Sequence, residues 1–176
     1  MMITSFLIIS GCNNDDDNNT TVQQNSFLKI GDNEYELKAG LIEDYGLYEP
    51  GLYNFDITLI SSNVVEVDGE PFPEDQIVNA IYFELFTDSQ TDLSTGVYSL
   101  VDFQNIGNQT FELCEISENV DVNSVEETGT FTGLVSGTLE VVANGPEYEF
   151  QFSGVDNLGQ DISGSYQGNL NSVLIE

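Results

Sequence analysis

The sequence has 176 residues, with 31 acidic side chains against two lysines, no arginine and no histidine, and its formal net charge at pH 7 is −29. This balance excludes nucleic-acid binding, which needs a basic patch to displace counterions from phosphates. The lack of histidine excludes imidazole-based catalysis and histidine metal sites. A hydrophobic content of 40%, with 11 Phe and 8 Tyr, is typical of a domain with a core and not of a disordered acidic chain.

The chain begins with an apolar run, Ile3–Ile9, that is too short to span a bilayer. The run ends in Ile9-Ser10-Gly11-Cys12, an aliphatic residue and two small residues before a cysteine. This pattern resembles the lipobox of bacterial lipoprotein signal peptides, which implies a signal peptide over residues 1–11 and lipidation of Cys12. A signal peptide normally opens with a positive charge and residues 1–11 carry none, so we expect the true translation start to lie upstream.

Residues 12–25 follow as a polar, acidic stretch with no apolar side chain from Asn13 to Thr21. Such a segment cannot bury surface, so we expect a flexible tether. The short acidic run behind Cys12 resembles the export signal of surface-exposed lipoproteins in Bacteroidota, although a solvated linker is the alternative interpretation. Asn13 replaces the aspartate of the usual inner-membrane retention signal. We therefore expect an outer-membrane protein that is lipid-anchored and faces the cell exterior.

From residue 26 onward, apolar and polar residues alternate with a period of two, and no stretch keeps a convincing helical period. We expect a single all-β domain over residues 26–176. In its first hairpin, a two-residue turn at Asp32-Asn33 would place Leu28 opposite Leu37.

Three segments in the middle of the chain also have strand patterns. Residues 53–59 alternate between apolar and polar side chains. Residues 81–85 alternate too, but Ala80, Tyr82 and Phe86 make the second face partly apolar, which is typical of a central strand. Residues 97–103 place Val97 and Phe103 on one predicted inner face.

A further turn is predicted at Asp68-Gly69. The segment after it contains Pro71 and Pro73, which lack the amide hydrogen that a paired central strand needs. We therefore place this segment on a sheet edge or in a loop.

The strongest hairpin pattern is centred on Asn144-Gly145, a preferred type I′ turn pair. A two-residue turn there would place Leu139 opposite Phe150. The same register would place Glu140 opposite Glu149, a repulsive like-charge pair.

The last predicted strand, residues 162–170, carries Gly164 and Gly168 on its inner face, which suggests a bend or a close approach to a facing strand. Counting all segments gives about eight or nine strands, a number typical of an antiparallel two-sheet sandwich. The alternative is a small closed, calycin-like barrel.

Two parts of the domain resemble uncharacterised surface lipoproteins of Bacteroidota. The first is Phe27-Leu28-Lys29-Ile30-Gly31 with Tyr35-Glu36-Leu37, and the second is Gly137-Thr138-Leu139-Glu140-Val141 with Tyr148-Glu149-Phe150 and Ile162-Ser163-Gly164-Ser165-Tyr166-Gln167-Gly168. These are strand and turn residues, so the resemblance implies a fold and a cellular location and identifies no catalytic residue.

Cys114 is the second cysteine, and Glu112, Glu115 and Glu118 are its acidic neighbours in sequence. Acidic neighbours raise the pKa of a thiol, which argues against a catalytic cysteine. We expect Cys114 to pack as a small hydrophobic residue, with a disulfide to Cys12 as the alternative.

Calcium is the metal that the composition favours, because oxygen ligands alone hold it. The candidate ligands are Asp156, Asn157 and Asp161, the segment 118–127 with Asp121 and Asn123, and the triad Glu66, Asp68 and Glu70. None matches a calcium-loop motif, and acidic turns facing solvent are the alternative interpretation for each. We expect no other cofactor.

These observations favour a non-catalytic module at the cell surface, with a structural role or with a protein or glycan partner. One alternative is a carrier of a small apolar ligand, in a barrel cavity lined by Tyr53, Phe55, Phe83 and Phe150. A second alternative is a glycoside hydrolase that uses two carboxylates, which the sequence does not locate. The acidic surface is also compatible with adaptation to high salt, whatever the function.

Overall fold

A computed structural model describes residues 26–67 and 69–173, so the predicted signal peptide, the lipidation of Cys12 and the tether lie outside the described residues. The described chain contains thirteen strands and one short 3-10 helix, η1 (Phe103–Asn105). In chain order the strands are β1 (Phe27–Ile30), β2 (Asn33–Glu36), β3 (Ala39–Glu49), β4 (Leu52–Ile60), β5 (Val64–Val67), β6 (Glu70–Pro73), β7 (Ile77–Thr87), β8 (Gly96–Leu100), β9 (Thr110–Asp121), β10 (Thr130–Ala143), β11 (Tyr148–Asp156), β12 (Asp161–Gly168) and β13 (Leu170–Val173). Among the described residues, no helix is long and apolar enough to cross a membrane.

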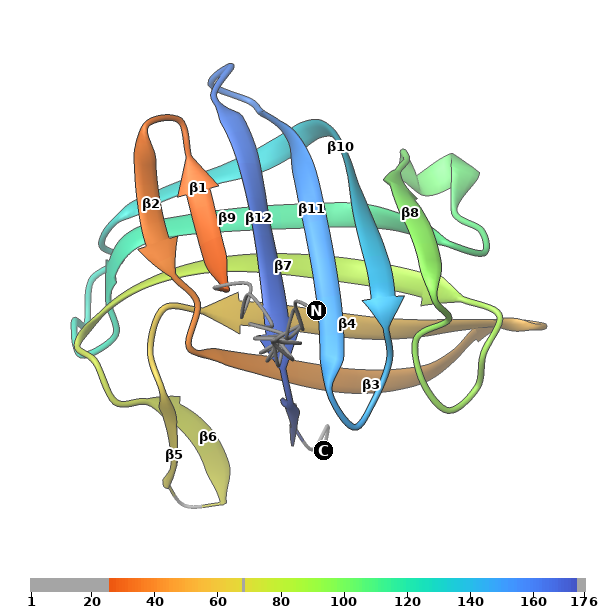
Figure 1. Ribbon diagram of the computed structural model, residues 1–176, viewed down its shortest axis with the longest axis horizontal. Coiled ribbons are helices and arrows are strands. Elements are labelled where there is room, and N and C mark those ends of the chain that lie inside the picture. The colour runs from red at the N-terminus through yellow and green to blue at the C-terminus, as the bar shows by residue number, and fades with distance from the viewer. Residues whose placement is uncertain (1–25, 68, 174–176) are drawn as a thin grey trace, which may run out of the picture.

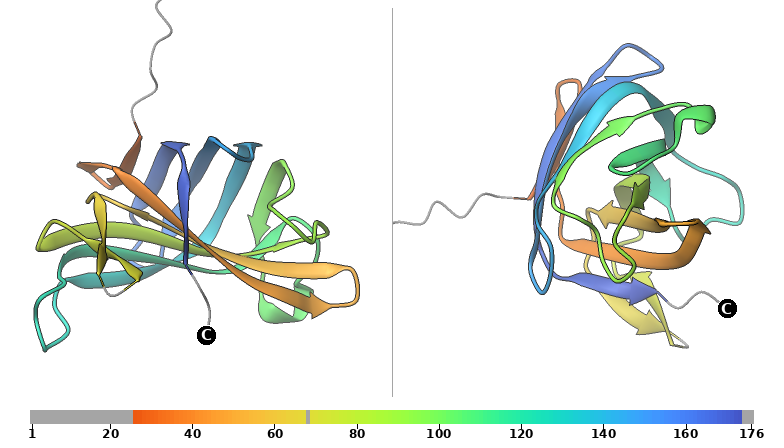
Figure 2. Two further views of the ribbon diagram at one scale, coloured as in Figure 1. Left: turned by 90° about the horizontal axis from the view of Figure 1, so that it is seen from below. Right: turned by 90° about the vertical axis from the view of Figure 1, so that its right-hand side faces the viewer.

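Eleven of these strands form one sheet in the order β13-β3-β4-β7-β9-β8-β10-β11-β12-β1-β2, and β5 and β6 pair separately. In Figure 1, β3, β4, β7 and β9 cross the view from side to side, and β1, β12 and β11 run nearly at right angles to them. Figure 2 shows that the sheet curls over on itself as a half-barrel. The prediction of an all-β domain is confirmed. The prediction of a two-sheet sandwich with about eight or nine strands is wrong, because one mixed sheet forms both sides of the core.

Strand β10 shows how one sheet can cover both sides of the core. Its first residues, Thr130 to Gly133, pair with β9, and residues 134–143 pair with β11. The register shifts between Leu134 and Ser136, where the pairing changes. A β-bulge bends and twists the strand that contains it. The sheet therefore turns within one long strand, at a place where the alternation pattern gives no sign of a bend.

The C-terminal segment joins two distant parts of the sheet. Strand β12 lies between β11 and β1, and after Asn169 the same segment continues as β13, which pairs in parallel with β3. Gly40 on β3 allows this pairing, because a side chain there would collide with Leu170 and would press on Tyr166.

The core lies inside the curl, between the two crossing groups of strands. One inner row runs across β1, β12, β11 and β10 through Leu28, Gly164, Phe152 and Leu139. From the opposite side, the ring of Phe83 on β7 packs edge-on against Phe152, with 5.7 Å between ring centroids. Side chains from the two halves thus fill the space between them.

The first hairpin has a different register from the predicted one. Leu28 pairs with Tyr35, and Ile30 pairs with Asn33, so the two turn residues are Gly31 and Asp32. Gly31 has a φ of 57°. Glycine takes positive φ without steric strain, and a two-residue turn with glycine first fits the twist of a hairpin. The predicted turn at Asp32-Asn33 is therefore wrong by one residue.

The hairpin between β10 and β11 also has a longer loop than predicted. Leu139 pairs with Phe152, and Glu140 pairs with Gln151, so the predicted repulsion between Glu140 and Glu149 across the strands is absent. The Asn144 side chain instead donates a hydrogen bond of 2.8 Å to the backbone oxygen of Leu93. A tertiary contact has overridden the local turn preference.

Strand β8 has the opposite face inward from the predicted one. Tyr98 is fully buried and its hydroxyl donates to the Ser94 carbonyl oxygen at 2.9 Å, whereas Val97 is 51% exposed. Phe103 leaves the strand and is exposed in η1. The larger ring of Tyr98 fills the end of the core, which the alternation of Val97 and Phe103 could not show.

The other predictions from the strand patterns agree better with the structure. In β4, Phe55, Ile57 and Leu59 are buried as predicted, but Asp56 on the other face is buried as well. Strands β5 and β6 form an isolated hairpin, in agreement with the prediction from the prolines, and residue 68 of its turn lies outside the described residues.

Candidate functional site: two hollows and an acidic row

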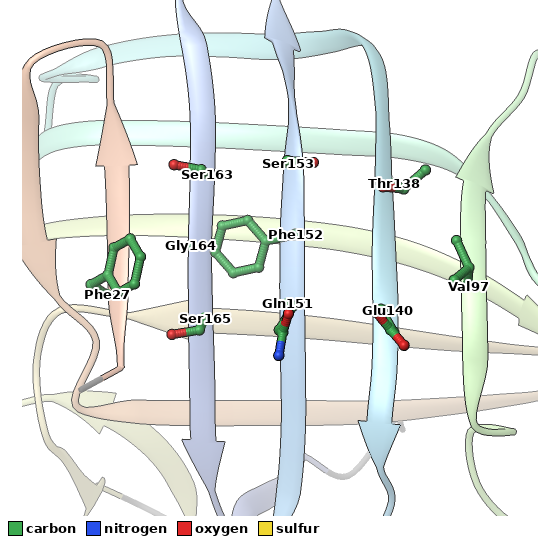
Figure 3. Close-up of a pocket in the computed structure, with 10 residues that line it drawn as sticks. All are labelled: Phe27, Val97, Thr138, Glu140, Gln151, Phe152, Ser153, Ser163, Gly164 and Ser165. Atoms are coloured by element: carbon green, nitrogen blue, oxygen red, sulfur yellow. The ribbon is translucent and has the colours of Figure 1, made fainter. Parts of the chain in front are cut away.

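A shallow depression of about 350 Å³, here called the outer hollow, lies on the outer face of the curled sheet. Figure 3 shows its side chains on neighbouring strands. The residues that line it are Phe27 on β1, Ser163, Gly164 and Ser165 on β12, Gln151, Phe152 and Ser153 on β11, Thr138 and Glu140 on β10, and Val97 on β8.

Cross-strand pairing explains the chemistry of the outer hollow. One row runs Phe27, Ser165, Gln151, Glu140, Val97. Because residues paired across strands share one face of a sheet, this row has an apolar side chain at each end and polar side chains between them. The adjacent row on the same face runs Ser163, Ser153, Thr138, whose side chains are short, so the sheet surface is low there.

A core side chain packs directly under Gly164, which forms the floor of the outer hollow. Gly164 pairs with Phe152, whose ring occupies the inner side of Gly164 where a Cβ atom would lie. The carbonyl oxygen of Phe27 closes the same space from β1. Sequence analysis predicted a bend or a close approach to a facing strand at Gly164, and the structure shows a close approach to the neighbouring strands β11 and β1.

A second depression of about 400 Å³, here called the seam hollow, lies where β3, β4 and β13 meet the start of β11 and the loop after β7. The residues that line it are Ile42, Asp44, Phe55, Thr91, Asp92, Tyr148, Ser172 and Val173. These residues come from five segments that the curl of the sheet brings together. No local sequence pattern indicates that Asp44 and Asp92 share a site.

Hydrogen bonds fix one wall of the seam hollow. The Tyr148 hydroxyl donates to Asp92 Oδ1 at 2.9 Å, and the Leu93 backbone nitrogen donates to the same oxygen at 2.8 Å. Burial, and then the hydrogen bond and negative charge of Asp92, raise the pKa of Tyr148 to about 12. The phenol therefore stays protonated and remains a donor. Its ring stacks on Phe150 with 5.8 Å between centroids, which joins this wall to the core.

An acidic row crosses the outer face of the other half of the sheet. Glu43, Asp56 and Glu84 are paired across β3, β4 and β7. Burial raises the pKa of Asp56, although hydrogen bonds from Tyr82 and from an asparagine partly oppose the shift. Burial, Asp56 and Glu112 raise the pKa of Glu84 to about 7. Neither hollow described above is lined by Glu84 or Glu112.

Of the predicted calcium ligands near the β11–β12 turn, Asp156 accepts hydrogen bonds from backbone amides. Asp156 is buried, and its Oδ1 accepts hydrogen bonds from the backbone nitrogens of Leu158 and Gln160 at 2.9 and 2.7 Å. Its Oδ2 is buried, and no residue in the described part of the chain forms a hydrogen bond with it. Asn157 and Asp161 are exposed.

The second predicted calcium segment forms a similar turn. Asp121 Oδ1 accepts from the Asn123 backbone nitrogen at 3.0 Å, and its Oδ2 accepts from Gln76 Nε2 at 3.0 Å. Glu66 and Glu70 are exposed on the isolated hairpin, and Asp68 lies outside the described residues. Within residues 26–67 and 69–173, no three acidic or cysteine side chains are grouped so as to hold a metal ion. Calcium binding stays a prediction.

Cys114 is a buried free cysteine. Burial, and then the charge of Glu115, raise the pKa of its thiol well above the ordinary value. It packs in the core, in agreement with the predicted role of a small hydrophobic residue.

No family model, no curated protein and no solved structure matches this chain.

Proposed function

We propose that the protein is a non-catalytic binding module held on the outer surface of a bacterial cell by a lipid on Cys12, and that it binds a glycan through the outer hollow. The observation that carries this proposal is the polar surface between Phe27 and Val97, where Gln151 and Glu140 lie beside a row of short side chains, Ser163, Ser153 and Thr138. The lipid anchor rests on the resemblance of Ile9-Ser10-Gly11-Cys12 to a lipobox.

The chemistry of the outer hollow suits a sugar. The exposed hydroxyls of Thr138 and Ser153 and the exposed Gln151 amide can both donate and accept hydrogen bonds, and Glu140 can accept them. Phe27 is partly exposed at the rim and offers an apolar surface for the C–H face of a sugar ring. The net charge of −29 disfavours anionic sugars. We therefore propose a neutral glycan.

The two alternative functions have less support. A carrier needs an internal cavity, but two of the predicted lining residues, Phe83 and Phe150, are fully buried among other core side chains. A glycoside hydrolase needs a cleft between its two carboxylates. The convergent pair Glu84 and Glu112 lies on the outer face of the sheet and lines neither hollow.

Binding of the full chain to a panel of neutral oligosaccharides tests the glycan proposal. Phe27→Ala and Glu140→Gln should each weaken the strongest interaction by about tenfold, equivalent to about 1.4 kcal/mol. The matched controls are Phe72→Ala on the isolated hairpin and Glu147→Gln in the β10–β11 loop, both exposed and outside the hollow. Equal losses in variants and controls, or no binding to any member of the panel, would contradict the proposal.

The anchor is tested separately by metabolic labelling with an alkyne fatty acid in a bacterial host. The wild-type chain should carry the label and sediment with the outer membrane, and Cys12→Ser should lose both properties. A Cys114→Ser variant is the control, because Cys114 is buried in the core. An unlabelled wild-type chain would contradict the anchor and leave the glycan proposal standing.

A further inference from the structure

The seam hollow has the size and wall composition of a small-molecule site. Its volume of about 400 Å³ lies within the range of roughly 300–1,000 Å³ that is usual for ligand pockets. Phe55 is buried at its base, and Ile42 and Val173 are partly buried beside it. These three side chains, with the ring of Tyr148, make its apolar part.

The charged part of the seam hollow is entirely negative. Asp44 and Asp92 line it, and none of the described residues that line it is basic. The chain has two lysines in all. Lys38 forms a salt bridge of 3.0 Å with Asp75, and Lys29 lies on β1 opposite Glu34. Neither lysine is therefore placed to neutralise the two carboxylates.

Each carboxylate is fixed through one oxygen. Asp44 Oδ1 accepts from the Gly46 backbone nitrogen at 2.8 Å, and Asp92 Oδ1 accepts from Leu93 and Tyr148. No hydrogen bond to Oδ2 of either residue is formed within the described part of the chain. Both carboxylates are thus oriented by the protein and keep an oxygen for an external donor.

From this arrangement we infer that the seam hollow binds a small organic cation with an apolar body, of the alkylammonium class. The ammonium group would lie between Asp44 and Asp92, and the alkyl chain would pack on Phe55, Ile42 and Val173. The Tyr148 ring adds a surface that attracts a cation. An anion would be repelled by both carboxylates, and a neutral alcohol would gain the apolar contacts without the charge pairing.

Three probes with six carbon atoms each separate the contribution of charge from that of apolar contact. They are hexylammonium, 1-hexanol and hexanoate. Each is titrated into the full 176-residue chain and followed by amide chemical shifts. Hexylammonium should shift the amides of Phe55 and Tyr148 and bind at least fivefold more tightly than 1-hexanol. Hexanoate should bind more weakly than either. Equal affinities of hexylammonium and 1-hexanol would overturn the inference in favour of an apolar site, and so would a lack of shifts around the hollow.

Matched variants locate the binding. Asp44→Asn and Asp92→Asn keep the side-chain shape and remove the charge, so each should weaken hexylammonium binding by at least threefold and leave 1-hexanol binding unchanged. Asp32→Asn, in the first turn, is the control and should change neither. Ser172→Phe, at an exposed wall position, should block all the probes. If Asp92→Asn loosens Tyr148, Asp44→Asn and Ser172→Phe still decide the question. Unchanged affinity in both of these variants would overturn the inference.

Discussion

Gly164 on β12 lies opposite Phe152 on β11, and the Phe152 ring occupies the inner side of Gly164 where any other residue would carry its Cβ atom. The carbonyl oxygen of Phe27 lies equally close on the other side. This contact places a large ring over a bare backbone. It therefore leaves no room for a side chain at position 164.

We predict that Gly164→Ala lowers the free energy of unfolding by about 2–3 kcal/mol, because overpacking of a filled site typically costs about 1–3 kcal/mol and one of the blocking atoms here is backbone. Urea unfolding followed by circular dichroism measures the change. Gly107→Ala is the matched control, since a Cβ atom at Gly107 meets nothing within 4 Å. Adding Phe152→Leu to Gly164→Ala should restore part of the loss. Equal stability of the two alanine variants would contradict the packing argument.

The acidic row should make stability fall as pH rises from about 4.5 to about 7. The ordinary pKa of Glu84 is 4.5, and burial with Asp56 and Glu112 raises it to about 7 in the folded state. Between these values the folded chain holds a proton that the unfolded chain has released, so the free energy of unfolding decreases with pH. The penalty is absent below the lower value and complete above the higher one. Glu84 is partly exposed, and solvent screening limits the expected fall to on the order of 1 kcal/mol.

Urea unfolding across this pH range, with Glu84→Gln as the variant, checks the effect. The variant should be more stable than the wild type at pH 7.5, about equally stable at pH 4, and should have a flatter profile. Glu147→Gln, which removes an exposed loop charge, is the control. Parallel profiles for the wild type and Glu84→Gln would show that Glu84 does not cause the slope.

Asp156 should stabilise the β11–β12 turn through its backbone hydrogen bonds. Asp156→Ala removes the acceptor of the Leu158 and Gln160 amides, and we expect a loss of about 1–3 kcal/mol with faster hydrogen exchange at both amides. Asp156→Asn keeps one carbonyl oxygen for these amides and removes a buried charge, so its loss should be smaller. A larger loss in the asparagine variant would point to a partner of Oδ2, such as a bound cation.

The thiol of Cys114 should be inert in the folded protein. The side chain is 2% exposed, and its raised pKa leaves almost no thiolate at neutral pH. In a Cys12→Ser background, a colorimetric thiol reagent should react within minutes in denaturant and hardly at all without it. Fast reaction of the folded protein would place Cys114 at the surface.

Sodium chloride should stabilise the domain. The formal charge of −29 produces repulsion that salt screens, and part of this repulsion lies between the paired carboxylates Glu43, Asp56 and Glu84. Raising the salt concentration from about 0.05 M to about 0.5 M should increase the urea midpoint, and Glu84→Gln should respond less than the wild type. A midpoint that does not depend on salt would mean that repulsion contributes little.

The sequence predicts the elements that depend on local pattern and misses those that depend on distant contacts. The alternation in residues 53–59 and 81–85 identifies two strands correctly, and the apolar face of each lies in the core as predicted. The inward face of β8 depends on the packing of Tyr98 in the core, and the loop after β10 depends on the hydrogen bond between Asn144 and Leu93. Both features depend on contacts with residues that are distant in sequence, such as Leu93 for Asn144.

The two hollows also differ in how far local sequence points to them. Sequence analysis singled out Gly164, which lies at the floor of the outer hollow, as a site of a bend or a close approach, but it predicted no binding surface there. The seam hollow joins Asp44 to Asp92 only because one sheet curls back on itself, and a two-sheet interpretation gives no reason to place them together.

The pairing of β1 with β12 also has a consequence for the order in which the chain can fold. Ser26, next to β1, accepts a hydrogen bond from the Gln167 backbone nitrogen, although the two residues are 141 positions apart. The ribosome synthesises β1 long before its partner β12. The edge of β1 that pairs with β12 therefore stays unpaired for most of translation. The sheet can therefore be completed only after the C-terminal strands β12 and β13 have been synthesised.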